Sequence, residues 1–104
     1  LSDRELIILY HLYCYSDEFL QPGQTKPEYN HQIQYLQEST PLSREHIIAI
    51  LVRLRRTGLL ITIGEREEQF DLMMTGIETM CISPIADEIK TWIYDSIHGV
   101  VAVK

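Results

Sequence analysis

The sequence is poor in cysteine, and its two cysteines follow no pattern that forms disulfides or binds metal. Cys14 and Cys81 lie far apart, and neither belongs to a Cys-x-x-Cys pair, which argues against a disulfide framework and a zinc ribbon. We expect both to be small buried residues. His11 and Cys14 are one helical turn apart, which suits two metal ligands, but the sequence offers no third or fourth ligand. It therefore predicts neither a metal site nor a cofactor.

Long hydrophobic runs and catalytic motifs are also missing. No apolar stretch approaches the roughly 18 residues of a membrane span, and the polar start Ser2–Glu5 differs from a secretion signal. We therefore expect a cytoplasmic protein without membrane contact. Because the chain begins at Leu1 and not at methionine, we expect it to have been trimmed. It has no glycine-rich phosphate loop, nucleophile elbow or partnered carboxylate pair, so we expect no enzyme.

Composition indicates one globular domain that spans residues 1–104. Hydrophobic residues make up 45% and charged residues 23% of the chain, values typical of a domain that folds around a core. The net charge of −6 disfavours indiscriminate attraction to nucleic acid. Four of the nine basic residues nevertheless fall between Arg44 and Arg56, so a local basic face is compatible with the acidic total.

A first helix is predicted in residues 1–20. Ser2 and Glu5 have capping-box spacing, and apolar residues follow at intervals of three and four positions. The dipeptide Pro22-Gly23 then forms a turn. Five tyrosines of this region and the next helix either line an effector pocket between the two helices or, as we expect, pack into the core; they are Tyr10, Tyr13, Tyr15, Tyr29 and Tyr35.

Two further helices are predicted before the middle of the chain. Residues 27–39 form one, with Pro27 in its first turn, apolar residues on one face and glutamines on the other. Residues 43–57 form the next, which Ser43 caps at its beginning and Gly58 ends. A short proline-containing turn separates the two helices.

The second half predicts a hairpin and a last helix. Two β-prone runs, Leu59–Ile63 and Phe70–Met74, are separated by a polar turn and predict a hairpin in residues 59–75. Ser83-Pro84 caps a helix in residues 83–98 that carries an apolar stripe and ends at Gly99. The apolar tail that follows must pack, pair as a strand or bind another subunit.

The order helix, helix, proline-containing turn, helix, hairpin, helix resembles the winged-helix regulators of the MarR and PadR type. The likeness covers most of the chain and is most specific in Ser43–Ile61, where a capped helix ends in Arg-Leu-Arg-Arg-Thr-Gly-Leu-Leu. The resemblance implies a mainly helical winged helix-turn-helix fold with a small β-hairpin, in which residues 43–57 form the recognition helix. It also implies a sequence-specific transcription regulator that binds double-stranded DNA as a homodimer.

The same resemblance assigns candidate contact residues. Those for DNA lie on the recognition helix: Ser43, Arg44, His46, Arg53, Arg55 and Arg56. Its first turn is nearest the base edges, whereas the later arginines suit phosphates. Alternatively, this basic face is only solvated and pairs with neighbouring carboxylates. The last helix is expected to form the dimer through Ile89, Trp92, Ile93 and Ile97.

A second function stays open because the apolar and acidic residues do not suit DNA. Ile48, Ala49 and Val52 stand where such regulators have polar or basic groups, and apolar side chains recognise little beyond thymine methyls. The turn between the predicted strands carries Glu65, Glu67 and Glu68, which phosphates repel. These residues predict instead a protein-interaction module with an apolar docking patch and a basic partner.

Overall fold

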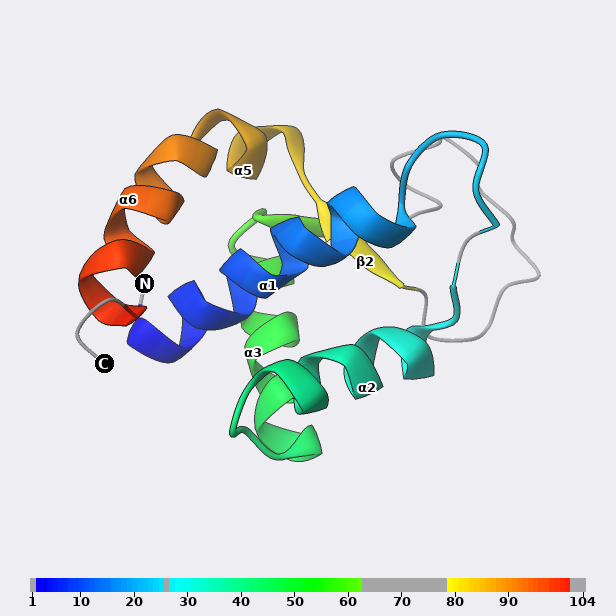
Figure 1. Ribbon diagram of the computed structural model, residues 1–104, viewed down its shortest axis with the longest axis horizontal. Helices are drawn as coiled ribbons and strands as arrows, with labels where there is room; N and C mark the ends of the chain where they lie inside the picture. The colour runs from blue at the N-terminus through cyan, green and yellow to red at the C-terminus, as the bar shows by residue number, and fades with distance from the viewer. Residues whose placement is uncertain (1, 26, 63–78, 102–104) are drawn as a thin grey trace.

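The computed structural model describes residues 2–25, 27–62 and 79–101, and within them the chain is mainly helical with a two-stranded antiparallel sheet (Figure 1). This confirms the predicted fold class at that level. The elements follow one another in the order α1 (Asp3–Phe19), α2 (Tyr29–Ser39), α3 (Arg44–Arg56), β1 (Leu60–Thr62), β2 (Met80–Ile82), α5 (Pro84–Glu88) and α6 (Lys90–Val101).

Serine caps begin three of these helices, as their positions in the sequence predict. The Oγ atom of Ser2 accepts a hydrogen bond from the Glu5 N–H at 3.2 Å. Ser43 and Ser83 do the same at 3.3 Å for the N–H groups of His46 and Ala86. Each cap satisfies one of the backbone donors that a helix start leaves unpaired.

Gly58 ends α3 and turns the chain into the sheet. Its φ is +84°, a conformation that L side chains rarely adopt. The N–H of Gly58 donates to the Arg55 carbonyl at 3.0 Å, and the N–H of Leu59 donates to the Leu54 carbonyl at 3.0 Å. These two bonds form a Schellman motif, so β1 begins two residues after the glycine.

The core forms around α1, which crosses the middle of the molecule with α2 on one side and α6 on the other (Figure 1). It also contacts α3 and β2. Its buried residues are Leu6, Ile8, Leu9, Leu12, Tyr13 and Tyr15. All of them except Tyr15 belong to one cluster with Ile33 and Leu36 of α2, the buried face of α3, and Ile93 and Ile97 of α6. Tyr15 packs with Leu20 and Cys81 in a second cluster. Removing these apolar surfaces from water is the main driving force for folding.

Gln32 fastens α2 to the sheet. Its side chain is fully buried, although we expected the glutamines of this helix to face solvent. The Nε2 group donates to the Met80 carbonyl at 2.8 Å, and Oε1 accepts from the Met80 N–H at 2.9 Å. One residue earlier, the Thr79 hydroxyl donates to the Pro27 carbonyl at 2.6 Å. A buried amide is tolerated here because it is paired on both of its ends.

The strand that pairs with β1 is one that we did not predict. Residues Leu60, Ile61 and Thr62 pair with Ile82, Cys81 and Met80. The predicted second strand, Phe70–Met74, lies outside the described residues, as do Glu65, Glu67 and Glu68. Cys81 itself is buried, as expected, whereas Cys14 is half-buried.

The last predicted helix is two helices. The break falls at Ile89, whose N–H bonds to the Ala86 carbonyl three residues back and so tightens the turn. The prediction that the helix ends at Gly99 is wrong, because α6 continues to Val101. A glycine ends a helix when it takes a positive φ, and in the described part of the chain only Gly23 and Gly58 do.

Replacing Gln32 with leucine should cost more than any change on the outer face of α2. The variant leaves the N–H and C=O of Met80 without this buried partner, which should lower the free energy of unfolding by about 2–5 kcal/mol. Gln34→Leu is the matched control, since Gln34 is exposed on the same helix and should change stability by about 0.5 kcal/mol or less. Urea denaturation of both variants measures the difference, and equal losses would contradict the role given to Gln32.

Candidate nucleic-acid interface

One side of α3 is buried and the other is exposed. Ile47, Ile50, Leu51 and Leu54 pack into the core. The opposite stripe, spaced by four, three and four residues as a helix requires, consists of the exposed residues Glu45, Ala49, Val52 and Arg56. The fold therefore presents α3 to solvent along its whole length. The exposed stripe has Glu45 at its amino end and Arg56 at its carboxyl end, and the exposed Arg44 precedes Glu45 in the first turn.

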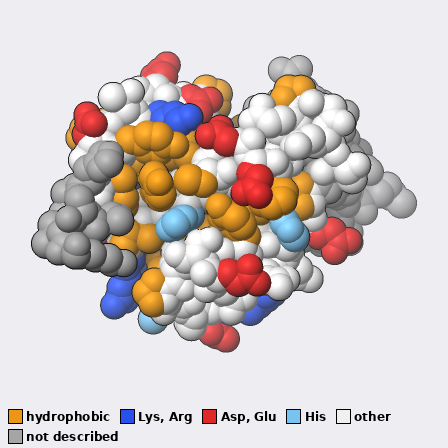
Figure 2. Space-filling model, in the orientation of Figure 1, with side chains coloured by type: hydrophobic (Ala, Val, Ile, Leu, Met, Phe, Trp, Pro, Cys, Tyr) orange, Lys and Arg blue, Asp and Glu red, His pale blue; other side chains and the backbone are white. Residues whose placement is uncertain are grey.

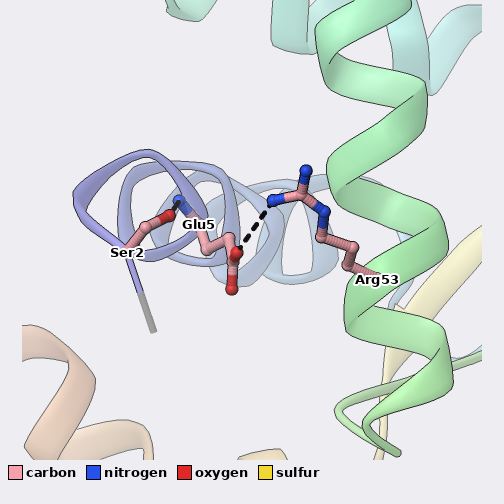
Figure 3. Close-up of polar contacts among 3 residues, drawn as sticks. All are labelled: Ser2, Glu5 and Arg53. Atoms are coloured by element: carbon pink, nitrogen blue, oxygen red, sulfur yellow. Dashed lines mark hydrogen bonds and ion pairs between the residues drawn. The ribbon is translucent and has the colours of Figure 1, made fainter.

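The four predicted DNA-contact arginines occupy different surroundings. Arg44 is exposed and donates a hydrogen bond to the Asn30 side chain of α2 at 3.1 Å. Arg53 forms an ion pair with Glu5 of α1 at 3.4 Å (Figure 3). Arg55 is half-buried, and Arg56 is exposed. Arg53 thus has an ion-pair partner, but this partner lies on α1 and is not one of the neighbouring carboxylates that the alternative prediction expected.

The Glu5–Arg53 pair joins a partly covered carboxylate to an exposed guanidinium. The side chain of Arg53 is 66% exposed and that of Glu5 is 16% exposed. The Glu5 backbone is held by the Ser2 cap, and its side chain points from α1 to α3 (Figure 3). A pair open to solvent on one side contributes about 1 kcal/mol or less, so Arg53 can exchange this partner for another anion.

The first turn of α3 carries the two weaker candidates for base contacts. The Ser43 hydroxyl oxygen accepts a hydrogen bond from the His46 N–H. The hydroxyl proton of Ser43 can still donate a hydrogen bond to another group. The His46 side chain is exposed. Asn30 of α2 lies beside Arg44 and was not predicted, because nothing in the sequence brings these two residues together.

An open cleft of about 570 Å³ runs beside the exposed side of α3. Two of the three residues of the predicted apolar patch, Ile48 and Val52, line it, whereas Ala49 belongs to the exposed stripe. The other lining residues come from α2, the end of α3 and the sheet: Tyr29, Leu51, Arg55, Arg56, Gly58, Leu60, Ile61 and Met80. Sequence spacing on α3 alone could not predict this cleft, because β1 and β2 form one of its walls.

The four residues expected to form a dimer do not share one surface. Ile93 and Ile97 are buried in the core of the single chain and pack against α1. Ile89 is half-buried, and Trp92 is 55% exposed. Ile85, which was not among the candidates, is 59% exposed. Among the side chains of α5 and α6 that the structure describes, Trp92 and Ile85 are thus the large apolar ones that are more than half exposed.

The tyrosines pack against one another, which favours core packing over an effector pocket. Tyr13 and Tyr15 are buried. Edge-to-face contacts join Tyr94 to both Tyr10 and Tyr13 at ring distances of 5.4 and 5.8 Å. Burial, together with the nearby charges of Asp87 and Tyr94, raises the pKa of Tyr13 to about 12. Figure 2 shows an apolar surface over α1, bordered by acidic, basic and histidine side chains.

His11 and Cys14 show no sign of a metal centre. His11 contacts the Tyr10 ring at 5.2 Å, and burial lowers the pKa of its imidazole. No cluster of three His, Cys, Asp or Glu side chains that suits a metal occurs in the described ranges. Within those ranges, no helix is long and apolar enough to cross a membrane.

Comparison of the chain with protein-family models, with curated proteins and with solved structures finds no match.

The neighbouring residues Trp92 and Ile93 should respond differently to truncation. Ile93→Ala removes a fully buried side chain and should lower the free energy of unfolding by about 2–5 kcal/mol. Trp92→Ala should change it by about 1 kcal/mol or less, because the indole is more than half exposed. Urea denaturation at low protein concentration tests both. Equal losses would contradict the burial described for α6.

Proposed function

We propose that this chain is a winged helix-turn-helix domain that binds double-stranded DNA through α3, as in the MarR- and PadR-type regulators that it resembles. The arrangement that supports this proposal is the packing of α1, α2 and α3 around one core, followed directly by an antiparallel pair of strands. In such a domain α3 enters the major groove and the sheet carries the wing. The regulator reads specific sequences through the first turn of α3.

The observation that carries the proposal is the exposed basic charge at both ends of α3. This helix holds four of the nine Lys and Arg residues of the chain and a single carboxylate, Glu45. Arg44 and Arg56 are its first and last residues, about 18 Å apart along the axis. The major groove is about 12 Å wide, so a helix of this length spans the groove and brings Arg56 to the phosphates on one of its sides.

The roles of the individual residues follow from their positions. Arg53 and Arg56 lie at the carboxyl end and contact phosphates, which positions the helix without reading sequence. Arg44, Ser43 and His46 lie at the amino end, nearest the base edges. Ala49 and Val52 face the groove between them, where their methyl groups suit thymine methyls. Asn30 holds Arg44 in place from α2.

A homodimer is part of the proposal, with Trp92 and Ile85 as its contact residues. Both are large apolar side chains that are more than half exposed, and aromatic anchors of this kind dominate many interfaces. A two-fold dimer would read a palindromic site.

A second candidate function is a protein-interaction module without DNA contact. It is favoured by Val52, which is 44% exposed at the edge of an apolar cleft. An apolar patch on an otherwise polar surface suits a protein partner. Salt dependence separates the two candidates, because counterion release makes DNA binding far more sensitive to salt than an apolar contact.

Arg56→Gln should weaken DNA binding about equally for all sequences. Loss of one phosphate contact should flatten the plot of log affinity against log salt concentration by about 0.9. Lys90→Gln is the matched control, since it removes the same charge from α6, which packs on α1. Fluorescence anisotropy with a labelled duplex at several salt concentrations measures both. Identical slopes for Arg56→Gln and the wild type would remove Arg56 from the interface.

Glu5→Gln should have the opposite effect and strengthen DNA binding at low salt. The variant frees the Arg53 guanidinium from its carboxylate and removes a negative charge beside α3. Asp3→Asn removes the same charge from the same turn of α1 without touching Arg53, so it should change affinity less. The gain should vanish in the Arg53→Gln background. A gain that persists there would mean that Glu5 acts only through net charge.

A further inference from the structure

The cleft beside α3 has the size and lining of a small-molecule site. Ligand sites usually occupy about 300–1,000 Å³, with apolar walls and a few polar groups that fix orientation. The cleft measures about 570 Å³. It lies between α3 and the sheet, so its walls are regular elements that the Gly58 turn and the Gln32–Met80 bonds hold in place.

The walls of this cleft are largely aliphatic. Leu51 and Leu60 are almost completely buried at its floor, and Val52 stands at its exposed edge. Ile48, Ile61 and Met80 complete the apolar part of the lining. Water in contact with such a surface is displaced favourably by an apolar chain. Among the described residues that line the cleft, Tyr29 is the one aromatic residue, and the others are mostly branched or flexible aliphatic side chains.

The charged groups among the described residues of the cleft are positive. Among the ten described residues that line it, two are arginines, Arg55 and Arg56, and none is Asp or Glu. Both lie at the carboxyl end of α3. At the other end, burial raises the pKa of the Tyr29 hydroxyl, and the nearby positive charge of Arg44 opposes that rise. A ligand with a negative charge at one end therefore suits this cleft, because its charged end can lie beside the arginines.

The length of the cleft along α3 indicates the length of the occupant. Ile48 and Arg56 line it and are eight residues apart, which corresponds to about 12 Å along the helix. A saturated chain of about ten carbons, with bonds of about 1.5 Å, has a similar extended length.

We propose that this cleft binds single-chain aliphatic carboxylates of about that length, with the carboxylate at Arg56 and the chain against Ile48, Leu51 and Val52. The site does not depend on DNA binding. Only its consequence for DNA rests on the proposed function: Val52 and Arg56 belong both to the cleft and to the exposed stripe of α3, so the carboxylate and DNA compete for the same surface.

The direct test is a titration of the whole chain with decanoate, followed by methyl and amide chemical shifts. Saturable shifts should concentrate at Ile48, Val52 and Ile61. Butanoate, which has the same carboxylate and a shorter chain, should bind at least about tenfold more weakly, because each buried methylene contributes about 0.8 kcal/mol. Decyltrimethylammonium, which has the same chain and the opposite charge, should also bind more weakly. Equal binding of the cationic probe, or shifts spread over the whole surface, would overturn the proposal.

Three variants locate the site. Val52→Asp places a carboxylate at the exposed edge and should reduce decanoate affinity at least about tenfold, because it repels the ligand and opposes burial of the chain. Arg56→Gln should reduce it about threefold, as expected for an exposed ion pair. Arg53→Gln is the control, since Arg53 does not line the cleft. The proposal is wrong if Arg53→Gln weakens binding as much as Arg56→Gln does.

DNA binding is measured separately, so that the two proposals fail independently. If the chain binds both ligands, decanoate should raise the apparent dissociation constant for DNA, and butanoate should not. Decanoate binding without any DNA affinity would refute the proposed function and leave the carboxylate site standing. DNA binding without localised decanoate shifts would refute the carboxylate site alone.

Discussion

The buried pairing of the Gln32 amide with the Met80 backbone is the constraint on which the arrangement of helices and sheet depends. Two strands of three residues cannot hold their position by their own hydrogen bonds. Gln32 acts on β2 as a neighbouring strand would, because it donates to the carbonyl and accepts from the N–H of one residue. The bond from Thr79 to Pro27 fixes the preceding residue to the start of α2. The cleft between Tyr29 and Met80 therefore has a fixed width.

A second set of hydrogen bonds joins the carboxyl end of α3 to Ser83, which directly follows β2 at the end opposite to Met80. The Ser83 hydroxyl caps α5 and donates to the Gly58 carbonyl at 2.6 Å. The Ser83 N–H donates to the Leu59 carbonyl at 3.1 Å. One residue thus begins a helix and holds the turn that ends another. Because α3 is tied at its carboxyl end and packed along one side, its exposed side is presented without freedom to rotate.

The parts of this fold that could be predicted from the sequence are those set by neighbouring residues. The capping residues act within one helical turn, so their spacing in the sequence was enough to predict where the helices begin and end; these residues are Ser2, Ser43, Ser83 and Gly58. The pairing of β1 with β2, the burial of Gln32 and the break at Ile89 depend on residues distant in the chain. The apolar stripe on α6 was visible, but periodicity cannot say whether a stripe packs on its own chain or on another. The candidate arginines were found from their place on the predicted recognition helix, whereas Glu5 and Asn30, the partners of Arg53 and Arg44, came only from the fold.

For the DNA binding that we propose, the Glu5–Arg53 ion pair is weak enough for a phosphate to replace the carboxylate, although the chain has a net charge of −6. An exposed ion pair contributes about 1 kcal/mol or less, whereas a phosphate contact also releases condensed counterions. Exchange of the carboxylate for a phosphate is therefore favourable at low salt and loses its advantage as salt rises. Without this ion pair, Arg53 would add its positive charge to those of Arg44 and Arg56. The added charge would strengthen binding to every duplex equally, because phosphate contacts carry no sequence information. In the DNA complex that we propose, the internal pair would reduce this unspecific contribution and leave the first turn of α3, with Ser43 and His46, a larger share in the choice of sequence.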